Sequence, residues 1–231
     1  MFLQRKDATM QANIPLEPGH YYHIYNRGNN RENIFIEERN YRYFMQLYQK
    51  YILSVCDTFA YCLMRNHFHV LVRVRETENQ TSEVLETSEV YNQTNNSQTS
   101  EVLKTSEVSA KKAITQQFSN FFNSYAKSIN NTYKRTGSLF QNRFGRIEVD
   151  SDRYFAQLIH YIHFNSQKHG FVEDFRKYPY SSYQAIITDK PTNICRAELL
   201  NWFQGKNSFV QLHDLLCDES VIQHLTQEDF D

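Results

Sequence analysis

The sequence predicts an α+β domain of the ferredoxin-like (RRM-like) kind, with helices on one face of an antiparallel sheet and a further helix toward the C-terminus. Three observations support this. The chain has 231 residues, of which 40% are hydrophobic, enough for one ordinary core. Segments with strand or helix periodicity follow one another in the order strand, helix, strand, strand, helix, strand. The one long stretch without such periodicity is a low-complexity repeat.

The first half of the chain contains three expected strands and one helix. Asn40 can cap that helix, whose apolar residues recur on one side, and Arg65-Asn66 is a short turn between the second and third strands. The strands are expected at 20–26, 58–64 and 67–74, and the helix at 40–55.

In the second half, a long helix is expected from about Ala110 to Tyr133, with large apolar residues at three- and four-residue spacing, and Gly137 ends it. Residues 138–149 are expected to be extended. A helix capped by Asp150 or Ser151 then runs through Asn165 and closes near Gly170.

A low-complexity segment at 76–108 separates the two halves. The tetrapeptide TSEV recurs at positions 81, 87, 99 and 105, with few large apolar residues between the copies. Such sequence cannot bury enough surface to fold alone, so we expect a disordered insertion in a single domain spanning 14–213. Residues 214–231 form an acidic tail.

The formal net charge of −1 hides a strong asymmetry. Residues 76–108 contain seven Glu against one Lys, whereas residues 111–147 contain seven basic residues and no acidic one. A basic stretch of this kind is typical of a surface that binds a nucleic-acid backbone, although a solvated helix face is the alternative for each cation. The expected phosphate contacts are Arg27, Lys127, Lys134, Arg135, Arg143, Arg146 and Lys168, with Phe140 as one aromatic available to stack on a base.

Neither a membrane span nor a secretory signal is expected, because no apolar run of sufficient length occurs. The four cysteines include no CxxC pair, which disfavours a disulfide framework or a cysteine-based zinc site. We therefore expect a cytoplasmic protein, associated with the nucleoid when it binds DNA.

Two histidines in the strand at 67–74 are candidate metal ligands. Period-two alternation places His67, His69, Leu71 and Arg73 on one face and the apolar residues on the other. Neighbours on the same face are close enough for one ion to bridge. An isolated His-x-His is weak support, since two polar residues on the solvent face of a half-buried strand have the same pattern.

The helix at 151–165 carries a second candidate group. Tyr161 and Asn165 lie four residues apart, one above the other beside the apolar stripe, so a phenol and an amide oxygen can reach one point. A boundary tyrosine with a buried ring and a solvated hydroxyl has the same pattern. Tyr180 and Gln184 repeat the spacing after Pro179, so the pattern alone does not single out Tyr161.

These motifs together resemble the single-tyrosine HUH transposases, in particular the REP-associated tyrosine transposase branch. The resemblance covers about residues 20–185 without the insertion. It is carried by YCLMRNHFHV around His67 and His69, by YIHFN from Tyr161 to Asn165, by the following Lys168-His169-Gly170, and by the early Tyr-Asn-Arg27-Gly28. Ser166 departs from the proline usual after the Asn, and the TSEV insertion has no counterpart in the family.

The resemblance implies an enzyme that cuts and rejoins single-stranded DNA through a 5′-phosphotyrosine. Tyr161 would be the nucleophile, in preference to Tyr180, and His67, His69 and Asn165 would bind a divalent ion, Mg²⁺ or Mn²⁺. The expected partner is single-stranded or hairpin DNA at the ends of a repeat element. A monomer is favoured, with a homodimer as the alternative.

Three other functions have the same features. The fold can serve as a non-catalytic hairpin-binding module. Relaxases and replication initiators also pair a His-x-His motif with tyrosine, but they are usually longer. A metallohydrolase that activates water would form no covalent adduct with DNA. The enzymatic interpretation requires the Tyr161 ring to lie on the same side of the sheet as the two imidazoles.

Overall fold

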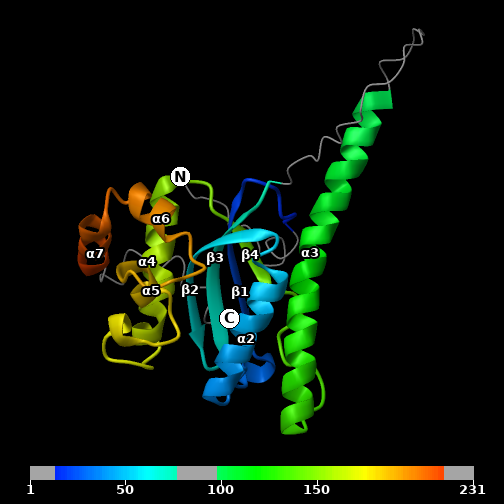
Figure 1. Ribbon diagram of the computed structural model, residues 1–231. Coiled ribbons are helices and arrows are strands. Elements are labelled where there is room, and N and C mark those ends of the chain that lie inside the picture. The colour runs from blue at the N-terminus through cyan, green and yellow to red at the C-terminus, as the bar shows by residue number, and fades with distance from the viewer. Residues whose placement is uncertain (1–13, 77–97, 216–231) are drawn as a thin grey trace, which may run out of the picture.

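The computed structural model describes residues 14–76 and 98–215, and for residues 98–112 it describes the backbone alone. Its centre is a four-stranded sheet in the order β2-β3-β1-β4, in which all three neighbouring pairs are antiparallel (Figure 1). The strands are β1 (Tyr21–Arg27), β2 (Cys56–Met64), β3 (His67–Val74) and β4 (Gly145–Glu148).

Helices cover both faces of this sheet. Figure 1 shows α2 and α3 on one side of it and α4 with the shorter α5, α6 and α7 on the other. The helices are α2 (Glu38–Tyr51), α3 (Gln98–Tyr133), α4 (Asp152–Lys168), α5 (Tyr183–Ile187), α6 (Arg196–Trp202) and α7 (Lys206–Leu215), with 3-10 turns η1 (Asn29–Arg31) and η2 (Phe175–Lys177). Within the described residues, no helix is both long enough and apolar enough to cross a membrane.

The α+β class and its element order are confirmed, with α2 and α3 on one face and α4 as the additional helix. Several boundaries differ from the prediction. The helix expected at 40–55 runs from Glu38 to Tyr51 with Glu37 as its N-cap, so Asn40 lies within it, and β2 begins at Cys56 rather than at 58. The fourth strand is shorter than the extended stretch expected at 138–149, because β4 pairs with β1 only at 145–148. The helices α6 and α7 were not predicted, because segments of seven and ten residues are too short to give a clear period.

The long helix begins earlier than expected. α3 starts at Gln98 rather than near Ala110, so residues 98–108 of the expected disordered insertion are helical. Residues 77–97, the rest of that insertion, and the acidic tail from 216 onward lie outside the described residues. The division into one domain with an insertion stays a prediction.

Strand β3 separates two hydrophobic cores. Its apolar residues at 68, 70, 72 and 74 belong to the core beneath α2 and α3, as the alternation predicted. Leu71 on the opposite face belongs to the core beneath α4, and His67 and His69 share that face. The strand is therefore buried on both sides, so the interpretation of the two histidines as residues on a solvent face is wrong.

The segment from Tyr178 to Cys195 covers the free edge of β2. The backbone N–H of Leu63 donates to the Tyr180 carbonyl at 2.9 Å, the N–H of Ser182 donates to the Tyr61 carbonyl at 2.9 Å, and the N–H of Cys195 donates to the Thr58 carbonyl at 2.9 Å. An uncovered edge strand invites pairing with another chain. This segment satisfies the β2 edge and ties the α5–α7 region to the sheet.

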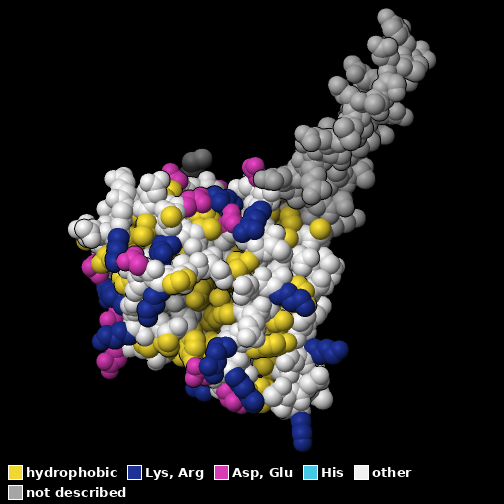
Figure 2. Space-filling view, in the orientation of Figure 1, with side chains coloured by type: hydrophobic (Ala, Val, Ile, Leu, Met, Phe, Trp, Pro, Cys, Tyr) yellow, Lys and Arg dark blue, Asp and Glu magenta, His cyan; other side chains and the backbone are white. Residues whose placement is uncertain are grey.

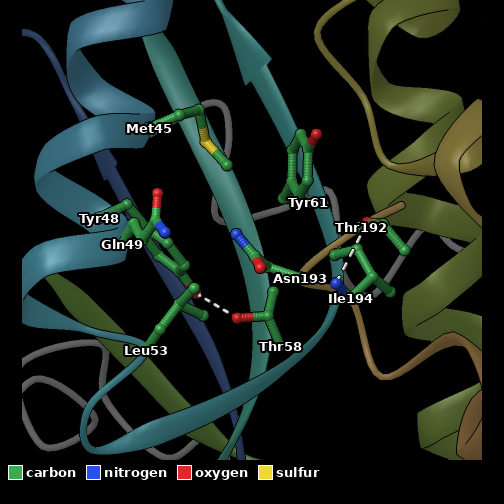
Figure 3. A pocket seen from close by; sticks show the side chains of 9 residues that line it. All are labelled: Met45, Tyr48, Gln49, Leu53, Thr58, Tyr61, Thr192, Asn193 and Ile194. Carbon is green, nitrogen blue, oxygen red and sulfur yellow. Dashed lines mark hydrogen bonds between the residues drawn. The ribbon is translucent and has the colours of Figure 1, made fainter. Parts of the chain in front are cut away.

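A small cavity of about 170 Å³ lies where this segment approaches α2 (Figure 3). Its floor includes the buried hydrogen bond between the Tyr48 hydroxyl and Thr58 Oγ1, 2.8 Å apart. Met45, Leu53 and Ile194 are among its apolar walls.

On the face of the molecule that is turned toward the viewer in Figure 1, Figure 2 shows hydrophobic side chains gathered in the middle, with Lys and Arg side chains around them.

Candidate active site

The helix α4 presents one face to the histidine-bearing side of β3. Ser151 caps it, because its Oγ accepts a hydrogen bond from the Tyr154 N–H. Residues four apart on a helix share a face, so Tyr161, Asn165 and the position of His169 form one row. The ring of Tyr161 contacts the ring of His69, and the ring of His169 contacts that of His67.

Tyr161 lies on the same side of the sheet as the paired imidazoles. Its ring centre is 5.4 Å from that of His69, at an interplanar angle of 76°, and 6.2 Å from that of His23. The Lys168 ammonium lies 5.4 Å from the Tyr161 ring centre. The tyrosine is fully buried, with 0% of its surface exposed, so its hydroxyl is not solvated as a boundary tyrosine would be.

Each of the two histidines is oriented through Nδ1. His67 Nδ1 lies 2.7 Å from Asn66 Oδ1, and His69 Nδ1 lies 2.9 Å from His23 Nε2. Hydrogen bonds of this kind fix the tautomer and the ring orientation of histidines that bind metals. In both residues Nε2 is then the nitrogen that would bind an ion.

Asn165 lies between the two ring contacts along the row on α4. Its side chain is fully buried, and neither Nδ2 nor Oδ1 has a hydrogen-bond partner among the described residues. A buried amide without partners is costly, and an amide oxygen of this kind is chemically able to bind a cation. The fit of Asn165 to a metal therefore rests on an unsatisfied amide in the correct row.

The separation of the two imidazoles also fits a shared ion. Rings that bind one ion at about 2.1 Å each have centres roughly 5 Å apart, and the centres of His67 and His69 are 5.4 Å apart. Three His, Cys, Asp or Glu side chains placed to hold an ion are not found within the described ranges. A site here therefore depends on the amide as its third protein ligand.

Sequence reasoning missed four residues that surround this group. His23 and Tyr25 come from β1, next to β3 in the sheet, and the Tyr25 ring centre is 5.9 Å from that of His69. Gly145 of β4 pairs with Tyr25, and a Cβ atom at Gly145 would lie 2.1 Å from that ring. His169 contacts His67 at 4.8 Å between ring centres. The alternation in HYYHIYN and the four-residue step from Asn165 to His169 were the signals available.

The alternative pair is placed elsewhere. Tyr180 stacks on Tyr41 of α2, with ring centres 3.7 Å apart, and its backbone is bonded to the edge of β2. Tyr180 is thus held against α2 rather than against the imidazoles. The structure brings Tyr161 and Asn165 to the histidines and leaves Tyr180 and Gln184 outside the group.

The predicted DNA-binding residues fall into separate places. Lys127 and Lys134 are exposed on α3 and at its end, whereas Arg135 is ion-paired with Glu32. Arg27 stands opposite His67 in the register of β1 and β3, and Lys168 lies over Tyr161. The last two, Arg143 and Arg146, line a cavity beside α3. Phe140 also lines it, but is 6% exposed and is chiefly a core residue.

Fold and site together define an α+β protein that sets a His-x-His strand against a tyrosine- and asparagine-bearing helix. The predicted resemblance to REP-associated tyrosine transposases is confirmed by sequence comparison. The chain is 27% identical over 131 residues to a Haemophilus influenzae protein described as "Putative REP-associated tyrosine transposase". That match covers 57% of this chain and 61% of the relative.

A solved structure of a REP-associated tyrosine transposase bound to a REP hairpin is also similar. It has a TM-score of 0.46 and 15% identity, and the match covers 83% of this chain and 89% of the other. No family model matches the chain.

Proposed function

We propose that this protein is a metal-dependent transposase or endonuclease that cleaves and rejoins single-stranded DNA through Tyr161. The observation that carries the proposal is the contact of Tyr161 with His69, across some ninety residues of sequence, on the face of the sheet that also carries His67. Asn165 supports it, because it lies one turn along α4 between the two residues of that helix that contact the histidines. Similarity to a described transposase supports the reaction class.

The residues that would hold the divalent ion are His67 and His69 through Nε2 and Asn165 through Oδ1. When bound, the ion supplies charge that polarises the non-bridging oxygens of a phosphodiester. Two nitrogen ligands favour Mn²⁺ over Mg²⁺ on ligand softness.

The chain's own residues supply the nucleophile and its surroundings. The Tyr161 oxygen forms a bond to phosphorus, the bond from phosphorus to the 3′ oxygen breaks, and the phenolic proton ends on the departing 3′-hydroxyl. The Lys168 ammonium lies over the Tyr161 ring, 5.4 Å from its centre, so it places positive charge next to the attacking side chain. Attack by another 3′-hydroxyl on the phosphotyrosine reverses these steps and joins strands.

One observation favours a second function, a hairpin-binding module without catalysis. Tyr161 is 0% exposed and its ring is enclosed by His23, His69 and Lys168. A DNA backbone can reach the hydroxyl only if these covering side chains move. The enzymatic proposal therefore requires the side chains around Tyr161 to move when substrate binds. The binding-module alternative requires no such movement.

A covalent-adduct assay separates the two functions. We expect the wild-type protein, incubated with a labelled hairpin bearing single-stranded flanks and Mn²⁺, to form a protein–DNA adduct that survives denaturation. Tyr161→Phe should abolish the adduct and retain binding, and Tyr180→Phe, the matched tyrosine, should leave both unchanged. An adduct from Tyr161→Phe at the wild-type level would reject Tyr161 as the nucleophile. Binding without any adduct in Mn²⁺ or Mg²⁺ would establish the binding module.

A further inference from the structure

A second cavity lies on the opposite face of the sheet from Tyr161. It has a volume of about 490 Å³ and opens between α3 and the segment from Gly137 to Arg146. This volume falls in the range of sites for small molecules and single nucleotides. The active-site proposal uses none of its lining residues.

The outer wall of the cavity is a bulge in the edge of the sheet. Before the bulge, the backbone N–H of Gln141 donates to the Arg27 carbonyl at 2.9 Å, and after it β4 pairs with β1. Residues 142–144 between these two pairings leave the ladder, and Arg143 has a left-handed φ of 64°. Bulges of this kind redirect side chains, and here the redirected residues Asn142, Arg143 and Phe144 line the cavity.

The cavity carries positive charge without an acidic residue in its lining. Arg146 Nε is buried and has no hydrogen-bond partner among the described residues. Burial, together with the nearby Arg143 charge, lowers the pKa of the Arg146 guanidinium. A partly buried cation that is repelled by a second cation is stabilised by an anion, and a phosphate matches the guanidinium geometry.

The remaining walls suit a nucleobase. Aromatic and amide side chains surround the space, and Phe144 already stacks beneath Arg146, whose guanidinium carbon is 4.5 Å from the ring centre. Amides can bond base edges in pairs, and aromatic rings stack on base faces. The amide residues are Asn26, Asn123, Asn130, Gln141 and Asn142, and the aromatic residues are Phe122, Phe140 and Phe144.

We propose that this cavity binds one nucleotide of the single-stranded DNA, with its phosphate at Arg143 and Arg146 and its base among the amides. That the bound nucleotide belongs to single-stranded DNA rests on the proposed function. The two sites are joined by neighbouring residues: Tyr25 and Gly145 face the Tyr161 side of the sheet edge, and Asn26 and Arg146 face the cavity. A strand that passes around β4 reaches both.

The test compares the affinity of a blunt hairpin with that of the same hairpin carrying a short single-stranded extension of each base in turn. Binding is followed by fluorescence anisotropy on a Tyr161→Phe background in EDTA, so that cleavage does not enter. The cavity variants are Asn123→Ala, at an exposed helix position that tolerates alanine, and Arg146→Gln. Arg42→Gln, on exposed α2, is the matched loss of one positive charge.

We expect at least one extension to strengthen binding about tenfold, the size of one good base contact. Asn123→Ala and Arg146→Gln should lose this gain, Arg42→Gln should keep it, and an abasic extension should show none. Retention of the full gain in folded Asn123→Ala, or with the abasic extension, overturns the cavity proposal. Because no step depends on an adduct, the result is independent of whether Tyr161 is the nucleophile.

Discussion

The rings of Tyr161 and His69 are in edge-to-face contact, with ring centres 5.4 Å apart and planes at 76°. This contact joins a helix that follows the whole sheet in the sequence to a strand from its first half. His23 from β1 is within hydrogen-bonding distance of the other side of the same imidazole, at 2.9 Å. His69 is therefore oriented by a residue of the sheet and covered by a residue of the helix. Changes in either neighbour should alter the affinity of the proposed metal site.

Gly145→Ala should disturb the site by moving Tyr25. A Cβ atom would lie 2.1 Å from the Tyr25 ring, which cannot stay where it contacts His69. We expect lower Mn²⁺ affinity by calorimetry and less adduct. Tyr25→Ala, which makes room for the methyl group, should cancel most of the added effect of Gly145→Ala in a double-mutant cycle. Additive losses would contradict this direct contact.

Asn66→Ala should weaken metal binding without removing a ligand. Asn66 Oδ1 lies 2.7 Å from His67 Nδ1. Loss of such an orienting partner typically costs roughly 10- to 100-fold in metal affinity. Titration with Mn²⁺ followed by electron paramagnetic resonance measures the change. Asn142→Ala, in the second cavity, is the control and should bind Mn²⁺ as the wild type does.

Acid should destabilise the protein through three buried histidines on the other side of α4. Burial lowers the pKa of His160 to about 4 and that of His213 to about 3. The pKa of His163 lies well below 6.5, chiefly because of burial and secondly because of repulsion from a charged His213. These histidines are neutral when folded and titrate near 6.5 when unfolded. Their contribution is therefore fully present above pH 6.5 and is lost as the pH falls below it.

A hydrogen-bond chain fixes the tautomers of two of these neutral histidines, whose charge is suppressed by burial. His213 Nδ1 donates to the Phe209 carbonyl, His163 Nδ1 donates to His213 Nε2, and the Ser182 hydroxyl donates to His163 Nε2, each at 2.8 Å. Between pH 6.5 and 5, each histidine should cost about 2 kcal/mol in the free energy of unfolding. Urea denaturation at the two pH values should show a smaller fall for His213→Gln; an equal fall would contradict the assignment.

Phe44→Ala should destabilise the α2–α3 core by about 3–5 kcal/mol, because it leaves a large cavity. The ring of Phe44 is fully buried and contacts Phe35, Phe68, Phe121 and Tyr125 at 4.8 to 5.3 Å between ring centres. Ile36→Ala, at a side chain that is 40% exposed, is the matched control. Urea denaturation should show a far smaller loss for the control.

Periodicity predicted much of this fold because its elements have strong one-dimensional patterns. The alternation around His69 correctly separated the two faces of β3, and the stripe on α4 correctly placed Tyr161 and Asn165 in one row. The prediction was weaker where local pattern competes with tertiary contact. β4 is short because a bulge at Arg143 interrupts its pairing with β1, and no local pattern marks that bulge.

The amino-acid pattern alone determined the class of fold, the pairing of His67 with His69, and the spacing of Tyr161 from Asn165, because side-chain periods of two and 3.6 residues act over short distances. Only the tertiary structure decided that α4 crosses the histidine face, that Tyr161 rather than Tyr180 lies there, and that His23 and His169 join the group. It also decided that Tyr161 is buried. These outcomes depend on packing between elements distant in the sequence, which no single segment encodes.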